Sequence, residues 1–296
     1  MKKTVIIGLV LLILGAAVFG LGYAGANGDF SVLSGSVGPL RVNIGNGDFA
    51  ITARDGFGGG KGSGESAAPR ITDRASGDRE TVSYDFEAAE RVIVEEDCAA
   101  VTVGVSPDSG IHVTASERSD YRCQCTLSGN TLRIKRESSV HTPLSAEDIQ
   151  LEILLPANTF CSLDLENDCG AVTAEGLYFK TLQLDTDVGS IELKNVRADT
   201  LEVSVDVGGI SMENVSVRKS SSLSTDVGSI ELDNFFGGEK TELETDTGSI
   251  SAALTGSASD YTVTTRTSGR ENTVSGGRNS VWAETDLGEI DIRFTE

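Results

Sequence analysis

The stretch Asp187-Val-Gly-Ser-Ile191 recurs with small changes through the second half of the chain. It returns as D-V-G-G-I at Asp206, D-V-G-S-I at Asp226, D-T-G-S-I at Asp246 and D-L-G-E-I at Asp286, and D-C-G-A-V precedes it at Asp168. The steps between these aspartates are about 19 or 20 residues, except for a last step of about 40. Because self-similarity at a short fixed period is the mark of a repeat fold, this stretch decides the architecture.

Apolar and polar residues alternate on both sides of each Asp-x-Gly. Leu182 and Leu184 precede Asp187, Ile191 and Leu193 follow it, and the residues between them are mostly polar. A period of two is that of a strand with one buried face. One rung of strand, turn, strand and short return cannot bury its own apolar face, so rungs must stack.

The sequence therefore predicts an all-β fold, a parallel β-solenoid of the β-helix type that we expect to be right-handed. We expect about seven coils of 19 to 20 residues, preceded by an N-terminal transmembrane helix. The step of about 40 residues is interpreted as two periods, with a degraded coil in which Arg266 stands in the Asp position.

Composition narrows the function. The chain has 296 residues, 5% of them aromatic, with 34 glycines and 5 prolines, which suits a narrow core of Leu, Val, Ile and Thr with many turns. The formal net charge of −21 argues against nucleic acid or an anionic membrane surface as partner, because phosphate-binding faces need clustered Lys and Arg. A solvated outer face explains the acidity; attraction of cations or basic partners is the other interpretation.

A charge-free run from Thr4 to Gly28 follows Lys2 and Lys3. About 20 apolar residues cross a bilayer, so residues 5–23 predict attachment to the cell membrane as a single-pass protein. The basic residues before the run place the N-terminus in the cytoplasm and the rest of the chain outside. The alternative is a cleaved signal peptide, since Ala24-Gly25-Ala26 is an A-x-A site. Residues 1–28 are taken as the anchor because the run exceeds a usual signal core.

Residues 29–80 are expected to form a flexible Gly/Ser-rich juxtamembrane region, with short apolar alternations such as Phe49-Ala50-Ile51 that suit a small hairpin. Gly60-Lys61 does not make a phosphate-binding loop, because Asp55 replaces the first required Gly and Gly62 the Ser or Thr. Residues 81–296 are predicted to be the β-solenoid domain. The strand-rich first part of this domain, up to Pro156, is expected to continue the same β body as its N-terminal cap.

Several further motifs accompany the repeats. They are G-D-F-S from Gly28 to Ser31, a strand that opens at Phe86, G-N-T-L-R-I from Gly129 to Ile134, and I-L-L-P from Ile153 to Pro156. In this order, behind one membrane segment, they make the chain similar to the putative-adhesin family of bacterial envelope β-solenoids. The resemblance covers about residues 81–296 and the anchor. It implies a non-enzymatic extracytoplasmic module for adhesion or envelope sensing, and it supplies no catalytic residues.

The column of turn aspartates is the feature most open to a functional interpretation. Stacked about 4.8 Å apart, carboxylates repel one another by roughly 1 kcal/mol per neighbour in water, so something must offset this cost. A Ca²⁺ ladder would do so through Asp168, Asp187, Asp206, Asp226, Asp246 and Asp286. The simpler alternative is that each carboxylate caps backbone N–H groups of its own turn. The second is favoured, because each turn offers one carboxylate where calcium takes six to eight oxygens.

Five cysteines are present, at 98, 123, 125, 161 and 169. Cys123 and Cys125 face the same side of one strand, so we expect them to pair elsewhere and not with each other. An exported location permits disulfides, but buried thiols acting as small apolar residues are the simpler interpretation, and the connectivity is open. His112 and His141 stand alone, so neither a Cys/His metal site nor any cofactor is expected.

No nucleophile with a base is recognisable, and neither G-x-S-x-G nor H-E-x-x-H occurs. We therefore expect a protein that is not an enzyme, a surface module for adhesion, binding or envelope sensing whose partner is an envelope protein or a glycan. One alternative is a carbohydrate-active β-helix enzyme, a polysaccharide lyase or hydrolase, although coils this short leave no long loops to wall a cleft. The other is a calcium-stabilised surface stalk.

Overall fold

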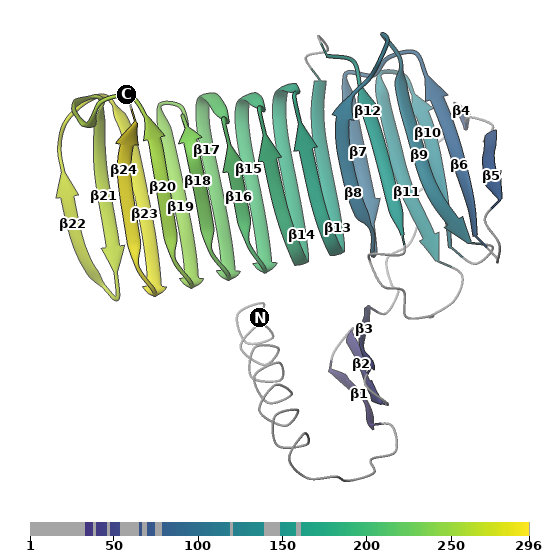
Figure 1. The fold of residues 1–296 in the computed structure, drawn as a ribbon, viewed down its shortest axis with the longest axis horizontal. Helices are drawn as coiled ribbons and strands as arrows, with labels where there is room; N and C mark the ends of the chain where they lie inside the picture. The colour runs from purple at the N-terminus through teal and green to yellow at the C-terminus, as the bar shows by residue number, and fades with distance from the viewer. Residues whose placement is uncertain are drawn as a thin grey trace. The chain divides into compact units, whose positions relative to one another are not determined.

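The computed structural model describes the backbone of residues 33–37, 40–45, 48–53, 65–66, 70–74, 79–118, 121–138, 149–157 and 161–295. Side chains are described from residue 80 on, except at positions 118, 137 and 138. The chain forms two compact units, residues 1–60 and residues 61–296. The first contains a three-stranded antiparallel sheet of β1 (Leu33–Val37), β2 (Leu40–Gly45) and β3 (Asp48–Ala53) (Figure 1).

The second unit is a stack of coils, each of which contributes one strand segment to each of two sheets (Figure 1). β13 (Cys161–Glu175) and β14 (Tyr178–Lys194) run through both sheets as single bent strands. The next coils are divided at the Asp turn, into β15 (Arg197–Val207) and β16 (Ile210–Glu213), β17 (Ser216–Val227) and β18 (Ile230–Phe235), and β19 (Lys240–Thr247) and β20 (Ile250–Thr255). β23 (Asn279–Leu287) and β24 (Ile290–Thr295) form the last of these coils in chain order.

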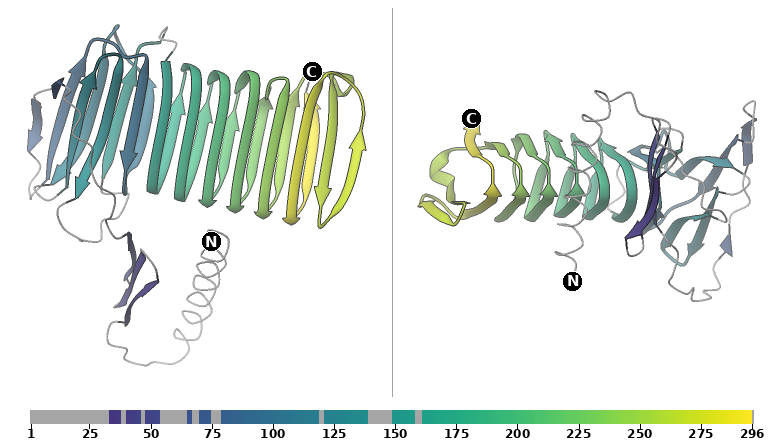
Figure 2. Two further views of the ribbon diagram at one scale, coloured as in Figure 1. Left: turned by 180° about the vertical axis from the view of Figure 1, so that it is seen from behind. Right: turned by 90° about the horizontal axis from the view of Figure 1, so that it is seen from below.

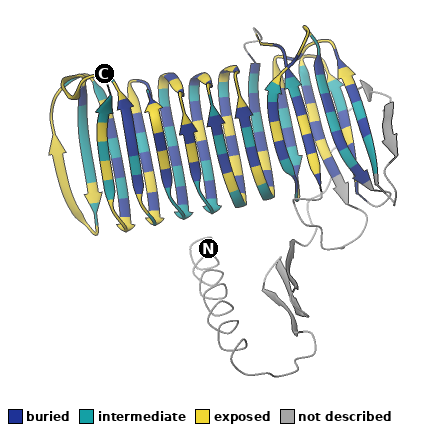
Figure 3. Cartoon of the chain, in the orientation of Figure 1, coloured by how far each residue is buried: buried dark blue, intermediate teal, exposed yellow. Residues whose placement is uncertain are grey.

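Neighbouring coils pair in parallel and in register. Leu182 lies opposite Leu201 across β14 and β15, and Ile191 lies opposite Ile210 across β14 and β16. All four side chains are buried, and the polar residues between them face outward, so the alternation predicted a two-sheet core correctly (Figure 3). The parallel solenoid that the repeats predict is therefore confirmed, while its handedness stays a prediction.

At the N-terminal end of the stack, the order of coils differs from the order of the sequence. β7 (Arg91–Glu96) and β8 (Ala100–Val105) form a coil that pairs in parallel with β13 on one side. On the other side this coil pairs in parallel with β11 (Thr131–Ser138) and β12 (Gln150–Leu155). The later coil β11–β12 thus lies outside the earlier coil β7–β8. Repeat spacing alone missed both coils, because neither carries the full Asp-x-Gly signature.

Antiparallel strands close this end, as the expected cap (Figure 2). β9 (Ile111–Arg118) pairs with β12, β6 (Arg79–Phe86) pairs with β9, and β5 (Arg70–Arg74) pairs with β6. In the other sheet β10 (Tyr121–Ser128) pairs with β11, and β4 (Glu65–Ser66) pairs with β10. The described residues between 81 and 157 therefore belong to the same β body as the repeats. The predicted juxtamembrane region 29–80 contains β1 to β5, and its flexibility stays a prediction.

The C-terminal end corrects the interpretation of the long step. β23 pairs in parallel with β19 and β24 with β20, so Asp286 follows Asp246 directly in the stack. The segment between them forms the short 3₁₀ helix η2 (Ala258–Asp260) and the hairpin of β21 (Tyr261–Thr267) and β22 (Arg270–Val274). β21 lies outside β23 and pairs with it in parallel. Because Thr267 is opposite Thr285, Ser268 and not Arg266 occupies the Asp position there.

The return between coils is made by a ladder of asparagines. Asn195, Asn214 and Asn234 have φ values of 53°, 55° and 51°, in the left-handed region that Asn tolerates better than most residues. Asn214 Nδ2 donates to Asn195 Oδ1 at 3.3 Å, and Asn234 Nδ2 donates to Asn214 Oδ1 at 2.7 Å. Thr255 Oγ1 continues the ladder to Asn234 Oδ1 at 2.9 Å. The same residue type thus supplies both the tight return and the bond between coils.

In the part of the chain that the structure describes, no helix is long and apolar enough to span a bilayer. The anchor predicted for residues 1–28 lies outside the described residues, as does His141.

Candidate functional site

The Asp-x-Gly turns form a column along one edge of the stack, and glycine is required there by space. A β-carbon on Gly189, Gly208, Gly228, Gly248 or Gly288 would overlap the carbonyl oxygen of the glycine in the preceding coil. These backbones approach too closely for any side chain, which explains why glycine recurs at this place in the repeat.

A buried polar column lies beneath the turns, at the residue before each Asp. Thr225 Oγ1 donates to Gly208 O at 3.0 Å, Thr245 Oγ1 to Gly228 O at 3.1 Å, and Thr285 Oγ1 to Gly248 O at 3.0 Å. In the coil of β13, Asn167 Nδ2 makes the equivalent bond to Ala99 O at 3.1 Å. Each bond joins the turn of one coil to the turn of its neighbour. We call the residues at this register position in successive coils the floor column. They are Arg136, Glu96, Asn167, Thr186, Val205, Thr225, Thr245 and Thr285.

The turn aspartates predicted as a ladder do lie on consecutive coils. In each coil, the residue before the turn aspartate is in register with its counterpart in the next coil. The turn aspartates are Asp168, Asp187, Asp206, Asp226, Asp246 and Asp286. The structure adds Asp97, because Asn167 lies opposite Glu96. The signal for Asp97 was the stretch D-C-A-A-V, which repeats D-C-G-A-V at Asp168 with Ala99 in place of the glycine.

The floor column ends in a buried ion pair. Arg136 Nε lies 2.9 Å from both carboxylate oxygens of Glu96, and neither side chain is exposed. Arg136 Nη1 donates to Ser116 O at 2.7 Å, and its guanidinium lies 4.9 Å above the centre of the Tyr121 ring. Burial raises the pKa of Glu96 to about 7, although Arg136 opposes the shift. Sequence reasoning missed this pair, because the two residues lie in the same sheet only after β11 stacks on β7.

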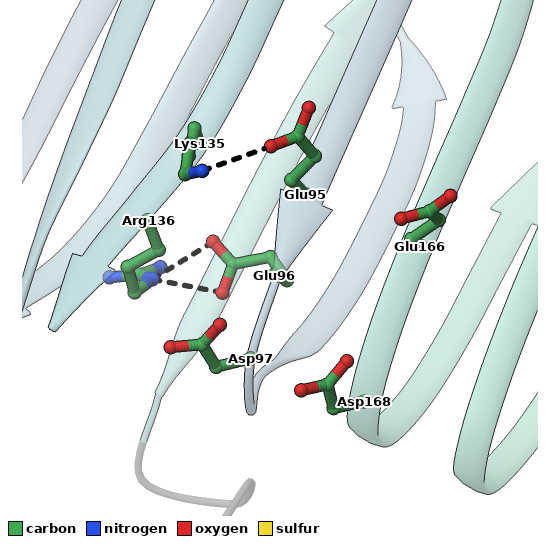
Figure 4. A pocket seen from close by; sticks show the side chains of 7 residues that line it. All are labelled: Glu95, Glu96, Asp97, Lys135, Arg136, Glu166 and Asp168. Carbon is green, nitrogen blue, oxygen red and sulfur yellow. Dashed lines mark hydrogen bonds and ion pairs between the residues drawn. The ribbon is translucent and has the colours of Figure 1, made fainter. Parts of the chain in front are cut away.

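A shallow pocket of about 150 Å³ opens above this ion pair (Figure 4). Three strands and the turns that follow them supply its walls, which are almost entirely charged. The lining residues are Glu95, Glu96, Asp97, Lys135, Arg136, Glu166 and Asp168. Partial burial and the charges of Asp187, Asp97 and Glu166 raise the pKa of Asp168 to about 7. The pocket is therefore acidic but holds carboxyl groups that take up protons near neutral pH.

Buried polar atoms without partners gather in the same column. In the described residues these side-chain atoms are Arg136 Nη2, Asn167 Oδ1 and Thr186 Oγ1. All three belong to the floor column, within four adjacent coils. Within the described ranges, however, no three His, Cys, Asp or Glu side chains are grouped as a metal site requires. The calcium ladder stays a prediction, with no preformed cage in support of it.

The outward side of the sheet that leads into the Asp turns is rich in acids. We call its carboxylates the acidic face: Glu95, Asp164, Glu166, Asp185, Glu202, Glu242, Glu244 and Glu284. Basic side chains pair with several of these acids: Arg91 Nη2 lies 2.8 Å from Asp164, Lys135 Nζ 3.3 Å from Glu95, Lys240 Nζ 2.7 Å from Glu242 and Arg266 Nη1 3.0 Å from Glu284. Gln183, Ser204, Ser222 and Ser224 complete the outward positions of the middle coils. Outward acids of these coils therefore lie on β13, β14, β15 and β19.

Cys98 and Cys169 directly follow Asp97 and Asp168 of this pocket, whereas Cys123, Cys125, Cys161 and His112 do not line it. None of the five cysteines forms a disulfide in this structure. Cys123 and Cys125 are buried with their sulfurs 3.7 Å apart, and neither forms a disulfide, so the expectation that they pair elsewhere stays a prediction. His112, on β9, lies between two acids, with its Nδ1 2.8 Å from Asp85 and its Nε2 3.0 Å from Asp108. The hydrogen bond to Asp85, followed in size of effect by the one to Asp108, raises the pKa of His112.

Residues 90–292 match the family model described as Toastrack DUF4097. The chain belongs to the Toastrack DUF4097 family. The match spans the coils from β7 to β24, which agrees with the stacked strands of Figure 1. No curated protein matches the chain.

Solved structures similar to this Toastrack DUF4097 chain include proteins named as adhesins. A putative adhesin from Bacteroides fragilis NCTC 9343 is 13% identical over 73% of this chain and 97% of its own, with a TM-score of 0.44. A putative cell adhesion protein from Clostridium sporogenes ATCC 15579 is 9% identical over 77% and 100%, with a TM-score of 0.36. A putative lipid binding protein from Parabacteroides distasonis ATCC 8503 is 14% identical over 74% and 98%, with a TM-score of 0.39. The family match supports the resemblance to the putative-adhesin family.

Proposed function

We propose that this protein is a non-catalytic, membrane-anchored module on the outer side of the cell membrane, and that its solenoid binds an envelope partner in adhesion or envelope sensing. The observation that carries the proposal is the acidic face. Stacking places outward residues about 4.8 Å apart, so carboxylates that are scattered in sequence gather on one side of the stack, in two groups separated by Ser222 and Ser224 of β17. A rigid polar surface of this kind suits recognition, since its side chains are held in place before a partner arrives.

The charge pattern favours a basic partner. Asp185 and Glu202 lie in adjacent coils and face outward, and acids occupy outward positions again in β13 and β19. The coil of β17, between β15 and β19, has Ser222 and Ser224 at these positions. Complementary charge speeds encounter and excludes like-charged partners, so a Lys/Arg-rich segment of an envelope protein fits this face better than a nucleic acid or an anionic lipid. A glycan partner would instead use the hydroxyl and amide groups of the same strands.

Binding is tested with the full chain and a fluorescent Lys-rich peptide, alongside a labelled neutral oligosaccharide, by fluorescence anisotropy. Glu202→Lys should weaken peptide binding about tenfold or more, because it reverses a charge within the face. Glu213→Lys is the matched control: it makes the same change in the same coil, on the outward side of the other sheet, and should leave binding unchanged. Equal effects of both variants, or no peptide binding, would contradict the acidic face as the contact surface. Oligosaccharide binding alone would point to a glycan.

Membrane topology is tested separately. Val274 lies on β22 with 63% of its surface exposed. In intact cells a membrane-impermeant maleimide should label Val274→Cys more strongly than the wild type, which provides the background of native thiols. Labelling that appears only after lysis would refute the extracytoplasmic location. Cell fractionation of the same variant checks whether residues 5–23 hold it in the membrane.

A calcium-stabilised stalk is the second candidate, because the turn aspartates lie on consecutive coils, where burial and then the charges of Asp187, Asp97 and Glu166 raise the pKa of Asp168. Thermal unfolding in EDTA and then in millimolar Ca²⁺ tests it. A ligand that binds the folded state raises the midpoint, whereas an unchanged midpoint would remove this candidate.

A further inference from the structure

Two cysteines far apart in the sequence meet where the coil β7–β8 joins the coil β13. Asn167 is opposite Glu96 and Val172 is opposite Val101, with equal numbers of residues between them, so Cys169 is opposite Cys98. Ala99 N donates to Cys169 O at 2.9 Å, which fixes this register through the turn. The two side chains are also hydrogen bonded to each other.

This position in the repeat favours contact between coils. Cys98 and Cys169 hold the middle place of the Asp-x-Gly turn, which is Val188, Val207 and Val227 in later coils. Strands in register are about 4.8 Å apart, within the range of about 4.4 to 6.8 Å that a disulfide allows between α-carbons. Both cysteines are partly exposed, whereas Cys123, Cys125 and Cys161 are buried. An oxidant can therefore reach this pair first.

We infer that Cys98 and Cys169 form a disulfide that joins the coil β7–β8 to the first Asp-x-Gly coil. The bond closes the loop of residues 99–168, which contains β8 to β12 and so carries much of the antiparallel cap. It connects two coils that are adjacent in space although the chain leaves the first and returns only after β12. A crosslink of this kind stabilises by restricting the unfolded chain, and long loops favour a larger effect.

The reaction is thiol–disulfide exchange with a donor disulfide R–S–S–R, either a small-molecule disulfide or an oxidised dithiol oxidoreductase. The Cys98 thiol donates a hydrogen bond to the sulfur of Cys169 and lowers the pKa of Cys169 to about 7, so Cys169 supplies the attacking thiolate. Its attack forms Cys169–S–S–R and releases R–S⁻. Deprotonated Cys98 then attacks the Cys169 sulfur and releases the second R–S⁻. The two protein thiols are oxidised, the donor is reduced to two thiols, and the two protons pass to the released thiolates.

The test treats the purified full chain with glutathione disulfide, alkylates the remaining thiols after denaturation, and identifies crosslinked peptides by mass spectrometry. The expected product links the peptides of Cys98 and Cys169 and leaves Cys123, Cys125 and Cys161 alkylated. The oxidised chain should unfold several degrees above the reduced chain. Cys98→Ser and Cys169→Ser should each abolish that difference, while Cys161→Ala keeps it.

The single variants also test the order of attack. Cys98→Ser retains Cys169 and should gain one glutathione quickly, whereas Cys169→Ser, which retains the less acidic thiol, should react more slowly. Recovery of both Cys98 and Cys169 as alkylated thiols in the oxidised wild type would overturn the inference. A crosslink between Cys123 and Cys125 in its place would overturn it equally. Because the readout in the wild type needs no substitution, a variant that fails to fold leaves the test intact.

Discussion

Thr225 Oγ1 donates a 3.0 Å hydrogen bond to the carbonyl oxygen of Gly208, the residue against which Gly228 packs in the next turn. The carbonyl of Gly208 therefore accepts a buried hydrogen bond and also leaves no room for a side chain at position 228. Thr245 and Thr285 repeat the arrangement, so the floor column and the glycine column act on the same carbonyls along the stack. This is how a motif of a few residues fixes the spacing between coils.

Gly228→Ala should destabilise the solenoid by about 3 kcal/mol or more, because the added methyl group meets backbone that cannot move aside. The backbone of Gly228 does not lie in the positive-φ region, so the cost is one of space alone. Gly209→Ala is the control, since a β-carbon there would be 3.5 Å from Ser229 O, an ordinary contact. Denaturant titration measures both free energies of unfolding. A mild Gly228→Ala would show that neighbouring coils can separate.

Thr225→Val and Thr186→Val should have opposite effects, although both replace a buried hydroxyl by a methyl group in the floor column. Thr225 loses its hydrogen bond to Gly208, at a cost of about 1 kcal/mol. Thr186 Oγ1 has no partner, so its removal should be neutral or should stabilise the fold. Val205 shows that the column accepts valine. Equal losses from the two variants would mean that Thr186 does have a partner, such as buried water.

Asn214→Ala should lower the free energy of unfolding by about 1 to 2 kcal/mol, because it removes two ladder bonds and puts alanine at a φ of 55°. Asn214→Gly loses the same bonds without the backbone strain and should be milder. The difference between the variants separates strain from hydrogen bonding. If glycine costs as much as alanine, the ladder bonds carry the effect and the left-handed backbone adds little.

Asp168 should make the protein less stable as the pH rises. Its pKa is about 7 in the folded chain and about 4 when unfolded, so the folded state binds the proton more tightly. Stability is then greatest below pH 4 and falls as the pH rises from about 4 to about 7. Asp168→Asn should raise the unfolding midpoint at pH 8 and change it little at pH 4. Asp286→Asn, at the end of the column beside Ser268, is the control and should have a smaller effect. A pH-independent change at Asp168 would contradict a raised pKa for this carboxyl group.

Arg136→Met should cost about 3 kcal/mol at pH 8, because it leaves Glu96 buried without its partner. The loss should shrink at pH 5, where the carboxyl of Glu96 takes up a proton. The double variant Glu96→Leu with Arg136→Met should recover most of the stability, since an apolar pair needs no desolvation of charge. Thermal unfolding at both pH values measures this cycle. A double variant as unstable as Arg136→Met would mean that the ion pair is needed for correct stacking.

The sequence by itself determined the repeating unit. The period of two around each Asp-x-Gly marked Leu182, Leu184, Ile191 and Leu193 as core, and the structure buries all four. Strand patterns and turn glycines are local properties, so they can be recognised without knowledge of the partner strand. The aspartates from Asp168 to Asp286 were placed in one column for the same reason, because identical rungs can stack only in register.

Only the tertiary structure decided which coil lies beside which. β7–β8 stacks between β11–β12 and β13, and β23–β24 stacks between β19–β20 and the hairpin β21–β22. These insertions bring Glu96 to Arg136 and Cys98 to Cys169, and they remove Arg266 from the Asp column. Sequence spacing could not reveal them, because a parallel coil exposes two similar edges and the order in which the edges are filled depends on global packing. Local pattern thus specified the rung, whereas long-range pairing at the N-terminal end of the stack created the pocket, the ion pair and the cysteine pair.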